Sequence, residues 1–335
     1  MLYYTDLDKR IYEMQNQIAS SNNIVIVSGY VGFRPIQELC DMCKGVNITV
    51  IYGMYGSERI SLPLHKALLD IQKNYPNITI LYSTIPVHAK IYTWNCDDNI
   101  KRALIGSANF SVSGLMNDYK EVLSDVSDNT FDSLKDYCNY VQSKAITCND
   151  ATVKTRQQYK ASVRSFQVQS LLSKGICRAT LLDRYGEVSR MSGLNWGLSK
   201  GHVSEGDAYI RITSNYIKLF PNLFPPKKYV GVENTQSKGK KTRENDEVEL
   251  IWDDGEKMVG LLEGQQTKTI DGLVYPKQLS SSPSKSILGK YLRRRIGVDV
   301  KHTITKADLK RYGRTSIDIS LIGEGIYYLD FSVNK

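Results

Sequence analysis

The sequence predicts two domains in series: an α/β domain in which helices flank a mixed sheet, followed by an all-β barrel. Three observations support this expectation. At 335 residues, the chain is longer than one hydrophobic core usually organises. Helical and strand patterns alternate as far as residue 150, and short strand-like runs separated by turns begin at Gly175. The stretch between them is basic and polar, so we expect domains at 1–150 and 175–335 joined by a linker at 151–174.

The first domain has a leading helix and then the order strand, helix, strand, helix, strand, followed by paired strands and a last helix. The expected helices are 6–19, 36–43, 64–75 and 131–141, and the expected strands are 23–32, 47–56, 78–83, 88–94, 103–107 and 121–126. Two of these strand runs end in a glycine-bearing exit. In a sheet of this class, functional residues gather at strand ends.

A candidate site lies between Val87 and Leu123. His88 and Lys90 are separated by one residue on a strand-like run, so both side chains point to the same face. A small polar turn, Gly106–Asn109, follows one hairpin later and can bring backbone N–H groups and an amide close to an anion. The pattern therefore places a nucleophile, a cation and an anion-binding turn together.

These residue types fit the cleavage of a phosphodiester. An imidazole nitrogen that attacks phosphorus forms a phosphohistidine, and the equatorial oxygens then need hydrogen-bond donors. Lys90, Ser107 and Asn109 are the candidate donors. Glu121 is the nearest carboxylate that can hold the second imidazole nitrogen of His88. No member of this set demands a metal or another cofactor.

The segments HAK, GSANF and KEVL resemble the HxK…GSxN…E signature of the phospholipase D superfamily, in particular its nuclease branch. Asn95 stands where that signature usually has Asp, a departure similar to the metal-independent restriction endonucleases of the BfiI and NgoFVII type. An isolated HxK can also be a strand histidine with a structural role, and the GSxN at the matching distance argues against that alternative.

The chain contains a single HxK. Phospholipase D enzymes pair two such motifs, one histidine attacking and the other protonating the leaving group. The resemblance therefore implies a homodimer in which His88 of each subunit enters one site, and two-fold pairing is the commonest oligomer symmetry. His65, at the start of an expected helix, is interpreted as an exposed residue near the helix cap.

Charge separates the two halves. Residues 1–150 contain 13 Lys and Arg against 16 Asp and Glu, and residues 151–335 contain 31 against 19. A basic surplus can be solvated surface or a polyanion-binding face, and beside a phosphodiesterase site it favours DNA.

The second domain contains strand-like runs at 177–183, 206–213, 247–254, 257–264 and 325–333, with a helix at 286–298. Two long polar loops, 192–206 and 235–246, lie between them and favour recognition or disorder. The pieces SGLNWG, LGKYLRRRIGV and KRYGRTSIDI resemble the C-terminal part of NgoFVII-type endonucleases, whose DNA-reading module is similar to the plant B3 pseudobarrel.

In such a module, loop side chains read base edges in the major groove. The candidate base readers are Asn195, Lys200, His202, Lys277 and Gln278. The candidates for phosphate clamps or scaffold are Arg293, Arg294, Arg295, Lys310, Arg311 and Arg314. The triple arginine can alternatively line an amphipathic helix with Ile287, Leu288, Leu292 and Ile296 buried.

The composition indicates the cellular compartment that we expect for this protein. No apolar run approaches the ~18 residues of a membrane span, and the N-terminus is too polar for a secretory signal, so a cytoplasmic protein without disulfides is expected. Cys40 and Cys43 have metal spacing but lack a second pair nearby, so buried thiols are favoured over a zinc site.

The preferred interpretation is a type II restriction endonuclease of type IIS-like behaviour, acting without metal through a phosphohistidine. Its expected partners are double-stranded DNA, a second subunit and a cognate DNA methyltransferase, with no membrane. The alternatives are a nonspecific or lipid phosphodiesterase, and a DNA-binding regulator with an inactive nuclease fold.

Overall fold

A computed structural model of the chain describes residues 1–18, 21–156, 171–172, 174–227, 246–264, 266 and 269–333. The chain divides into two compact units. The first contains Met1–Gln158 together with Ile322–Ile326, and the second contains Tyr159–Leu321 together with Tyr327–Lys335. The chain passes from the first unit to the second within the segment predicted as a linker, much of which lies outside the described residues.

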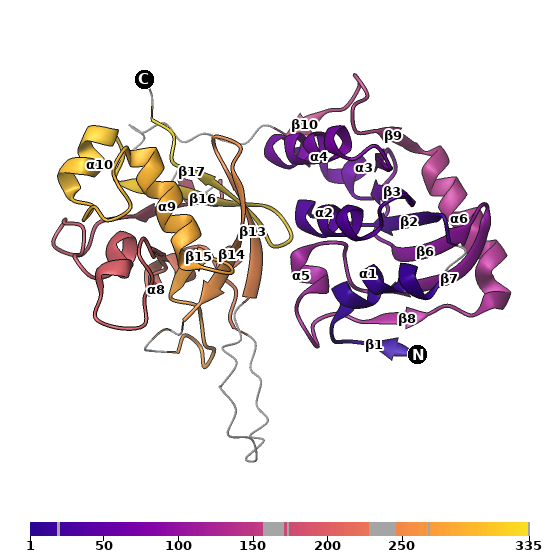
Figure 1. Cartoon of the computed structure of the whole chain (residues 1–335), viewed down its shortest axis with the longest axis horizontal. Coiled ribbons are helices and arrows are strands. Elements are labelled where there is room, and N and C mark those ends of the chain that lie inside the picture. The colour runs from indigo at the N-terminus through magenta and orange to yellow at the C-terminus, as the bar shows by residue number, and fades with distance from the viewer. Residues whose placement is uncertain are drawn as a thin grey trace, which may run out of the picture. The chain divides into compact units, whose positions relative to one another are not determined.

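The first unit is built on a mixed eight-stranded sheet with helices on both faces (Figure 1). Its strands are β1 (Leu2–Tyr3), β2 (Asn23–Ser28), β3 (Asn47–Tyr52), β5 (Ile78–Ser83), β6 (Lys90–Cys96), β7 (Asn99–Gly106), β8 (Leu123–Asp125) and β9 (Ala145–Thr147). They lie in the order β1-β8-β7-β6-β2-β3-β5-β9. β2, β3 and β5 are parallel, and the other neighbours are antiparallel. The predicted mixed α/β sheet is confirmed.

A separate parallel pair joins β4 (Ile60–Ser61) to β10 (Thr155–Arg156). The helices of the unit are α1 (Leu7–Gln17), α2 (Phe33–Met42), α3 (Tyr55–Glu58), α4 (Leu62–Asn74), α5 (Val112–Leu115) and α6 (Phe131–Ser143), with a 3₁₀ turn η1 (Asp128–Thr130). α1, α2 and α4 lie on one side of the sheet and α6 lies on the other (Figure 1). Cys138 and Val141 of α6 pack on Val27, Ile51 and Leu81 of the central strands.

Local sequence explains where several helices begin and end. α4 carries Pro63 in its first turn, where a missing N–H costs nothing, and it ends at Asn74, ahead of Pro76. In the second unit, α9 (Lys285–Ile296) starts after Ser284, whose side chain accepts the N–H of Ser286. It stops at Gly297, which has a positive φ of 77°.

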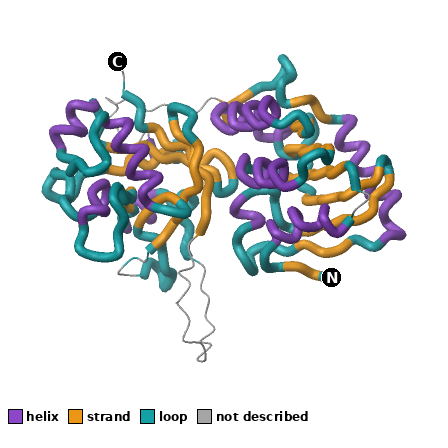
Figure 2. Tube along the Cα trace, viewed as in Figure 1, coloured by secondary structure: helices purple, strands orange, loops and turns teal. Residues whose placement is uncertain are grey.

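The second unit contains a seven-stranded sheet in the order β11-β16-β17-β13-β14-β15-β12. Figure 2 draws the strands of both units in orange. The strands are β11 (Ile176–Thr180), β12 (Ile210–Arg211), β13 (Asp246–Trp252), β14 (Lys257–Glu263), β15 (Gln278–Ser281), β16 (Ser316–Gly323) and β17 (Ile326–Asp330). The two edge strands, β11 and β12, come close to each other, so the sheet nearly closes. The predicted pseudobarrel is confirmed.

Helices α8 (Ser214–Leu219) and α10 (Lys306–Tyr312) and the 3₁₀ segment η2 (Gly193–Leu198) complete this unit together with α9. Its main described core cluster includes Trp252 of β13, Leu288 and Leu292 of α9, and Ile317 and Ile319 of β16, and a smaller cluster joins Leu171 and Ile176. One face of α9, with Leu288, Leu292 and Ile296, is therefore buried against the sheet. Ile287, which the amphipathic pattern also predicted to be buried, is exposed.

Some elements of the second unit were not predicted. The sequence analysis did not predict β15, β16, α8 or α10. The strand that it predicted at 206–213 is observed only as the two residues of β12. Residues 235–245 of the second polar loop lie outside the described residues, as do Ala19 of the first predicted helix and most of the linker.

Candidate functional site

His88 lies just before β6 in an extended segment and is exposed, whereas Lys90 is the first residue of β6 and is buried. Lys90 Nζ lies 2.9 Å from His88 Nδ1 and 3.1 Å from Nε2, and it donates to the His88 carbonyl oxygen at 2.7 Å. The nucleophile and the cation predicted from HxK are therefore in direct contact. Burial lowers the pKa of Lys90, while the negative charges of Glu324 and Glu121 act in the opposite direction.

Two glycines bring the His88 segment onto the strand ends. Gly29 follows β2 and Gly53 follows β3. Gly29 N–H donates to Ala89 O at 3.1 Å, and Val87 N–H donates to Gly53 O at 3.0 Å. A Cβ on Gly53 would lie 2.1 Å from the carbonyl oxygen of Val87, so only glycine allows this approach.

Asn109, at the end of the GSAN turn, is buried. Its Oδ1 accepts the backbone N–H of Tyr30 at 3.1 Å. Its Nδ2 donates to the carboxylate of Glu324 at 2.5 Å, within the first compact unit. The amide therefore presents its donor end to an anionic group.

Ser107 is exposed, and its Oγ accepts the N–H of Val122 at 3.1 Å. Its own hydroxyl proton can therefore be donated elsewhere. Ile91 of β6 pairs with Ile105 of β7, and this pair ends the described β6–β7 ladder. A role for Ser107 beside His88 stays a proposal.

Glu121 precedes β8 and is half-buried. Its charge favours the protonated form of Lys90. Among the described residues, no hydrogen bond joins its carboxylate to the imidazole of His88, whose two nitrogens face Lys90 Nζ instead. The orienting role predicted for Glu121 stays a proposal.

Asn95, which stands where an Asp is usual in the HxK signature, is remote from His88. It lies near the far end of β6, about 5 residues or roughly 16 Å beyond Lys90. Its side chain is buried and donates to Thr93 Oγ1 at 3.2 Å. An amide at this position therefore leaves the contacts around His88 unchanged.

Sequence reasoning missed the contribution of the β2 exit to this site. The ring of Tyr30 meets His88 edge-on, with 6.2 Å between ring centroids, and Tyr30 OH donates to Glu58 at 2.7 Å. Burial, followed by this bond, raises the pKa of Tyr30 to about 12. Only the glycine that follows the strand hinted at a functional exit in the sequence.

The prediction that His65 is exposed was wrong. It lies on α4 and is half-buried, with Nδ1 3.0 Å from the hydroxyl of Tyr82, and burial lowers its pKa.

Cys40 and Cys43 are both buried, and burial raises their pKa values to about 12 and about 11. The described residues contain no group of three or more His, Cys, Asp or Glu that could hold a metal ion. All six cysteines are free.

In the second unit, the candidate base readers fall into two groups. Lys200, His202 and Lys277 are exposed. Asn195 is fully buried: its Nδ2 donates to Ser189 O and Ile304 O, and its Oδ1 accepts Ile304 N–H. Gln278 is also buried and donates to Glu263. Because both amides are used inside the fold, we correct the prediction that Asn195 and Gln278 are presented to DNA.

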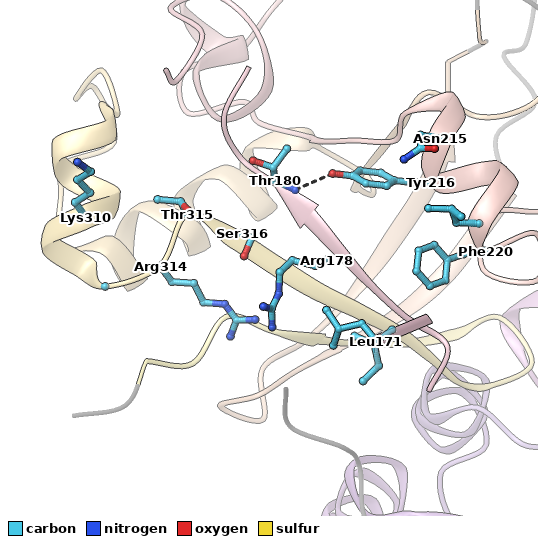
Figure 3. A pocket seen from close by; sticks show the side chains of 13 residues that line it. Leu171, Arg178, Thr180, Asn215, Tyr216, Phe220, Lys310, Arg314, Thr315 and Ser316 are labelled. Atoms are coloured by element: carbon cyan, nitrogen blue, oxygen red, sulfur yellow. Dashed lines mark hydrogen bonds between the residues drawn. The ribbon is translucent and has the colours of Figure 1, made fainter. Parts of the chain in front are cut away.

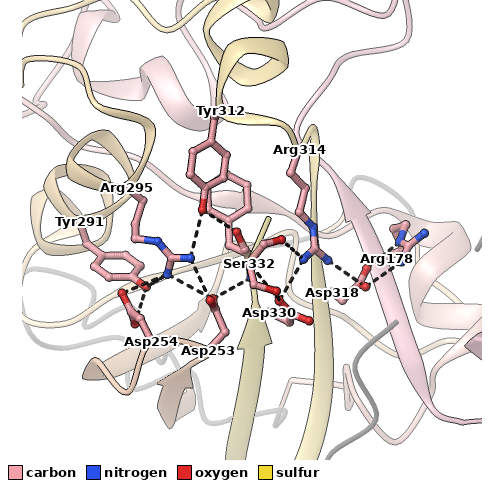
Figure 4. A network of polar contacts seen from close by, with 11 residues as sticks. Arg178, Asp253, Asp254, Tyr291, Arg295, Tyr312, Arg314, Asp318, Asp330 and Ser332 are labelled. Carbon is pink, nitrogen blue, oxygen red and sulfur yellow. Dashed lines mark hydrogen bonds and ion pairs between the residues drawn. The ribbon is translucent and has the colours of Figure 1, made fainter. Parts of the chain in front are cut away.

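Three candidate phosphate clamps are also held within the fold, and two of them, Arg295 and Arg314, are drawn in Figure 4. Arg295 pairs with Asp253 at 2.9 Å, and Arg314 pairs with Asp318 at 2.8 Å and Asp330 at 3.0 Å. Arg293 is 1% exposed, and burial lowers its pKa. These side chains form scaffold, which was the alternative left open by the sequence.

A cavity of about 640 Å³ lies beside β11, α8 and the end of α10 (Figure 3). Leu171, Ile176 and Phe220 form part of its wall, and Tyr216 OH accepts the N–H of Thr180 at its rim. Two arginines of the wall are already paired with Asp318. The cavity is therefore mainly apolar, with little unpaired charge among its described residues.

Within the residues described, no helix has both the length and the apolar character needed to cross a membrane.

Among curated proteins, none matches the sequence. Three solved structures that resemble the chain are NucT from Helicobacter pylori, polyphosphate kinase from Porphyromonas gingivalis and Nuc, a phospholipase D family member from Salmonella typhimurium. Their identities are 17%, 15% and 13%, and their TM-scores are 0.31, 0.28 and 0.29. The matches cover 44%, 44% and 41% of this chain, and 97%, 24% and 89% of the other chains.

Two family models match successive parts of the chain. Residues 5–155 match the NgoFVII restriction endonuclease N-terminal PLD domain, and residues 169–323 match the NgoFVII C-terminal B3-like DNA-binding domain. Together the two matches cover most of the sequence. The chain therefore belongs to the NgoFVII restriction endonuclease family, with a phospholipase D-like nuclease domain followed by a B3-like DNA-binding domain.

Proposed function

We propose that the protein is a type II restriction endonuclease, type IIS-like in its cutting, that hydrolyses DNA through a covalent phosphohistidine without a metal ion. The observation that carries this proposal is the grouping of His88, Lys90 and Asn109. An exposed imidazole contacts a lysine ammonium, and a buried amide presents its donor end nearby. A Cβ built on Gly29 would touch both His88 and Asn109, so these two side chains flank the same point.

In the first step, a nitrogen of His88 attacks phosphorus, the P–N bond forms, and the P–O bond to the leaving nucleoside breaks. Lys90, Asn109 and Ser107 donate to the phosphoryl oxygens, with the ammonium exchanging the imidazole for an oxygen of the phosphate. The departing oxygen takes a proton from a general acid. In the second step, water attacks phosphorus and gives a proton to the group that acted as the general acid, the P–N bond breaks, and a terminal phosphate and free His88 result.

This donor set supplies what a metal would otherwise supply. The ammonium neutralises charge, and the amide and hydroxyl direct hydrogen bonds to the oxygens. Metal independence is therefore part of the proposal.

The general acid is proposed to be His88 of a second subunit, so the active species is a homodimer with one composite site that cuts one strand at a time. Apolar side chains are exposed near the site on one face of the sheet: Leu2 of β1, Ile105 of β7 and Val122, which precedes β8. They offer a surface for self-association next to Ser107 and Glu121.

A subunit-mixing experiment tests the shared site. The parent protein is exchanged with an excess of His88→Ala subunits, and activity is expected to fall below the value that dilution gives, because each mixed dimer carries a broken site. Activity that follows only the fraction of parent subunits, or full activity in a verified monomer, would overturn the shared site.

The second unit is proposed to select the sequence. Lys200, His202 and Lys277 are exposed and remain the candidate DNA contacts. Since cutting at a defined sequence endangers host DNA, a cognate methyltransferase and a cytoplasmic location belong to the same proposal. The alternatives lack support from the fold: a lipid or nonspecific phosphodiesterase does not need a B3-like domain, and an inactive regulator does not need the His88 grouping.

One experiment tests the chemistry and the specificity together. The purified protein is incubated with a large mixed-sequence DNA in EDTA, and the ends produced are sequenced. Ends at a fixed distance from one short sequence are expected. Random ends would indicate a nonspecific nuclease. Ends that form only when magnesium replaces EDTA would remove the metal-free route, and the absence of ends under both conditions would remove the proposal.

A further inference from the structure

We propose that Ser28–Tyr30, the exit of β2, is a positioning element that fixes the orientation of Asn109 and the place of His88. This inference rests on the proposed phosphodiester chemistry. None of the three residues belongs to the HxK or GSxN motifs, and all three reach those motifs through contacts in the folded chain.

The hydroxyl of Ser28 ties the β2 exit to the GSAN turn. Ser28 is fully buried, and its Oγ accepts the N–H of Phe110 at 2.9 Å while it donates to Tyr30 O at 2.6 Å. Phe110 directly follows Asn109, and Phe110 O accepts the N–H of Gly32 at 2.8 Å. One hydroxyl therefore holds both backbone segments that meet at Asn109.

Tyr30 decides which end of the amide faces the reaction. Its backbone N–H donates to Asn109 Oδ1 at 3.1 Å, which only the carbonyl end of the amide can accept. The Nδ2 end is then directed outward, where it donates to the carboxylate of Glu324. A phosphoryl oxygen requires the same donor, so the Tyr30 N–H presets the amide in the catalytic orientation.

Gly29 lies between the side chains of His88 and Asn109, and its lack of a side chain leaves room for both. A Cβ at Gly29 would lie 3.1 Å from His88 Cδ2 and 3.4 Å from Asn109 Oδ1. An alanine Cβ would therefore require the His88 imidazole to move by a few tenths of an ångström, and a larger side chain would require more. The element thus acts on both motifs at once.

The chain contains a matched control for Ser28. Ser83, at the end of β5, is also fully buried, and its Oγ donates to the carbonyl oxygen two residues later, Ile85 O, at 2.7 Å. The same burial and the same local bond occur there, and no contact joins Ser83 to Asn109 or His88 in the described structure. The two serines differ mainly in that the Ser28 hydroxyl also accepts the N–H of Phe110, next to Asn109.

The test compares Ser28→Ala with Ser83→Ala in the full-length protein. The probes are DNA under single-turnover conditions and bis(4-nitrophenyl) phosphate, a small activated phosphodiester. Because a misplacement of about 1 Å can cost roughly 100-fold, Ser28→Ala is expected to lower kcat by roughly 10- to 100-fold with KM nearly unchanged. Ser83→Ala is expected to keep the kcat of the parent. If Ser28→Ala does not fold, Gly29→Ala takes its place, with the same expected loss.

A double-variant cycle separates positioning from a general loss of structure. In an Asn109→Ala background, the effect of Ser28→Ala on kcat should largely disappear, because the amide that it positions is gone. An undiminished effect in that background, or equal losses in the two serine variants, would overturn this inference alone. A parent protein that cleaves neither probe would overturn the proposed function and this inference with it.

Discussion

The two units use positive charge in opposite ways. In the first unit, Lys90 Nζ contacts the imidazole and the carbonyl oxygen of His88, so its ammonium can bind a phosphate without giving up any ion pair found in the described structure. In the second unit, Arg295 and Arg314 each face two carboxylates and are largely enclosed by the fold (Figure 4). In the unit with the basic surplus, several positively charged side chains therefore form ion pairs within the fold.

The net charge of a domain therefore does not show which of its surfaces binds nucleic acid. The half with a net negative charge contains Lys90, the cation that we propose binds a phosphate. The more basic half contains arginines whose removal would leave buried carboxylates without a partner. Exposed side chains such as Lys200 and Lys277 are better candidates for DNA contact than the triple arginine. The predictions below test this contrast.

The largest effect is expected at His88. His88→Ala removes the nucleophile and should lower the cleavage rate by about 10⁴-fold or more, with DNA affinity nearly unchanged because the second unit supplies it. His65→Ala is the matched control, since His65 contacts Tyr82 instead, and it should keep most of the activity. Substantial cleavage by His88→Ala in gel assays would show that another group attacks.

The next effect concerns stability in the second unit. Arg314→Ala leaves Asp318 and Asp330 buried with a lost partner and should lower the free energy of unfolding by roughly 3–5 kcal/mol. Arg294→Ala removes an ion pair with Glu256 that is mostly exposed, and it should cost no more than about 1 kcal/mol. Urea unfolding of both variants measures the difference, and equal losses would contradict the scaffold role of Arg314.

A smaller effect is expected in the pH profile of cleavage. Burial lowers the pKa of Lys90, so the catalytic ammonium loses its proton at a lower pH than an ordinary lysine does. The rate should therefore fall on the alkaline side as pH rises through this lowered pKa. Lys90→Arg keeps its charge and should move that fall to higher pH, even if its maximum rate is reduced. An identical alkaline limb in both proteins would mean that a different group titrates.

The smallest effect concerns a single DNA contact. Lys200→Ala should leave the free energy of unfolding unchanged because the side chain is exposed. It should reduce the slope of log affinity against log salt by about 0.9 if the lysine neutralises one phosphate. Lys101→Ala, at an exposed position of β7, is the control and should leave the slope unchanged. Titrations of labelled DNA by fluorescence anisotropy at several salt concentrations measure the slope for each variant.

Sequence patterns predicted the first unit well and the second unit less completely. The βαβαβ order, the helix that ends ahead of Pro76 and the strand predicted at 88–94 all depend on local signals. All three are present, although that strand is shifted to Lys90–Cys96 and leaves His88 just before it. β16 was missed although Ile317, Asp318, Ile319 and Ser320 alternate apolar and polar residues as a strand does; what the pattern does not predict is that Asp318 and Ser320 are buried as well. Asp318 can be buried because Arg178 and Arg314 pair with its carboxylate.

The sequence by itself determined the chemistry that the chain carries: a histidine and a lysine two residues apart, a GSAN turn, and a domain order that resembles a restriction endonuclease. Residue type and spacing suffice for that, because strand geometry fixes which neighbours share a face. Only the tertiary structure decided which polar side chains are presented. It enclosed Asn195 and Arg314 in internal bonds, and it brought the exit of β2 against Asn109, 81 positions along the chain from Ser28. Such pairings arise from packing between strands that are remote in sequence, and no local pattern encodes them.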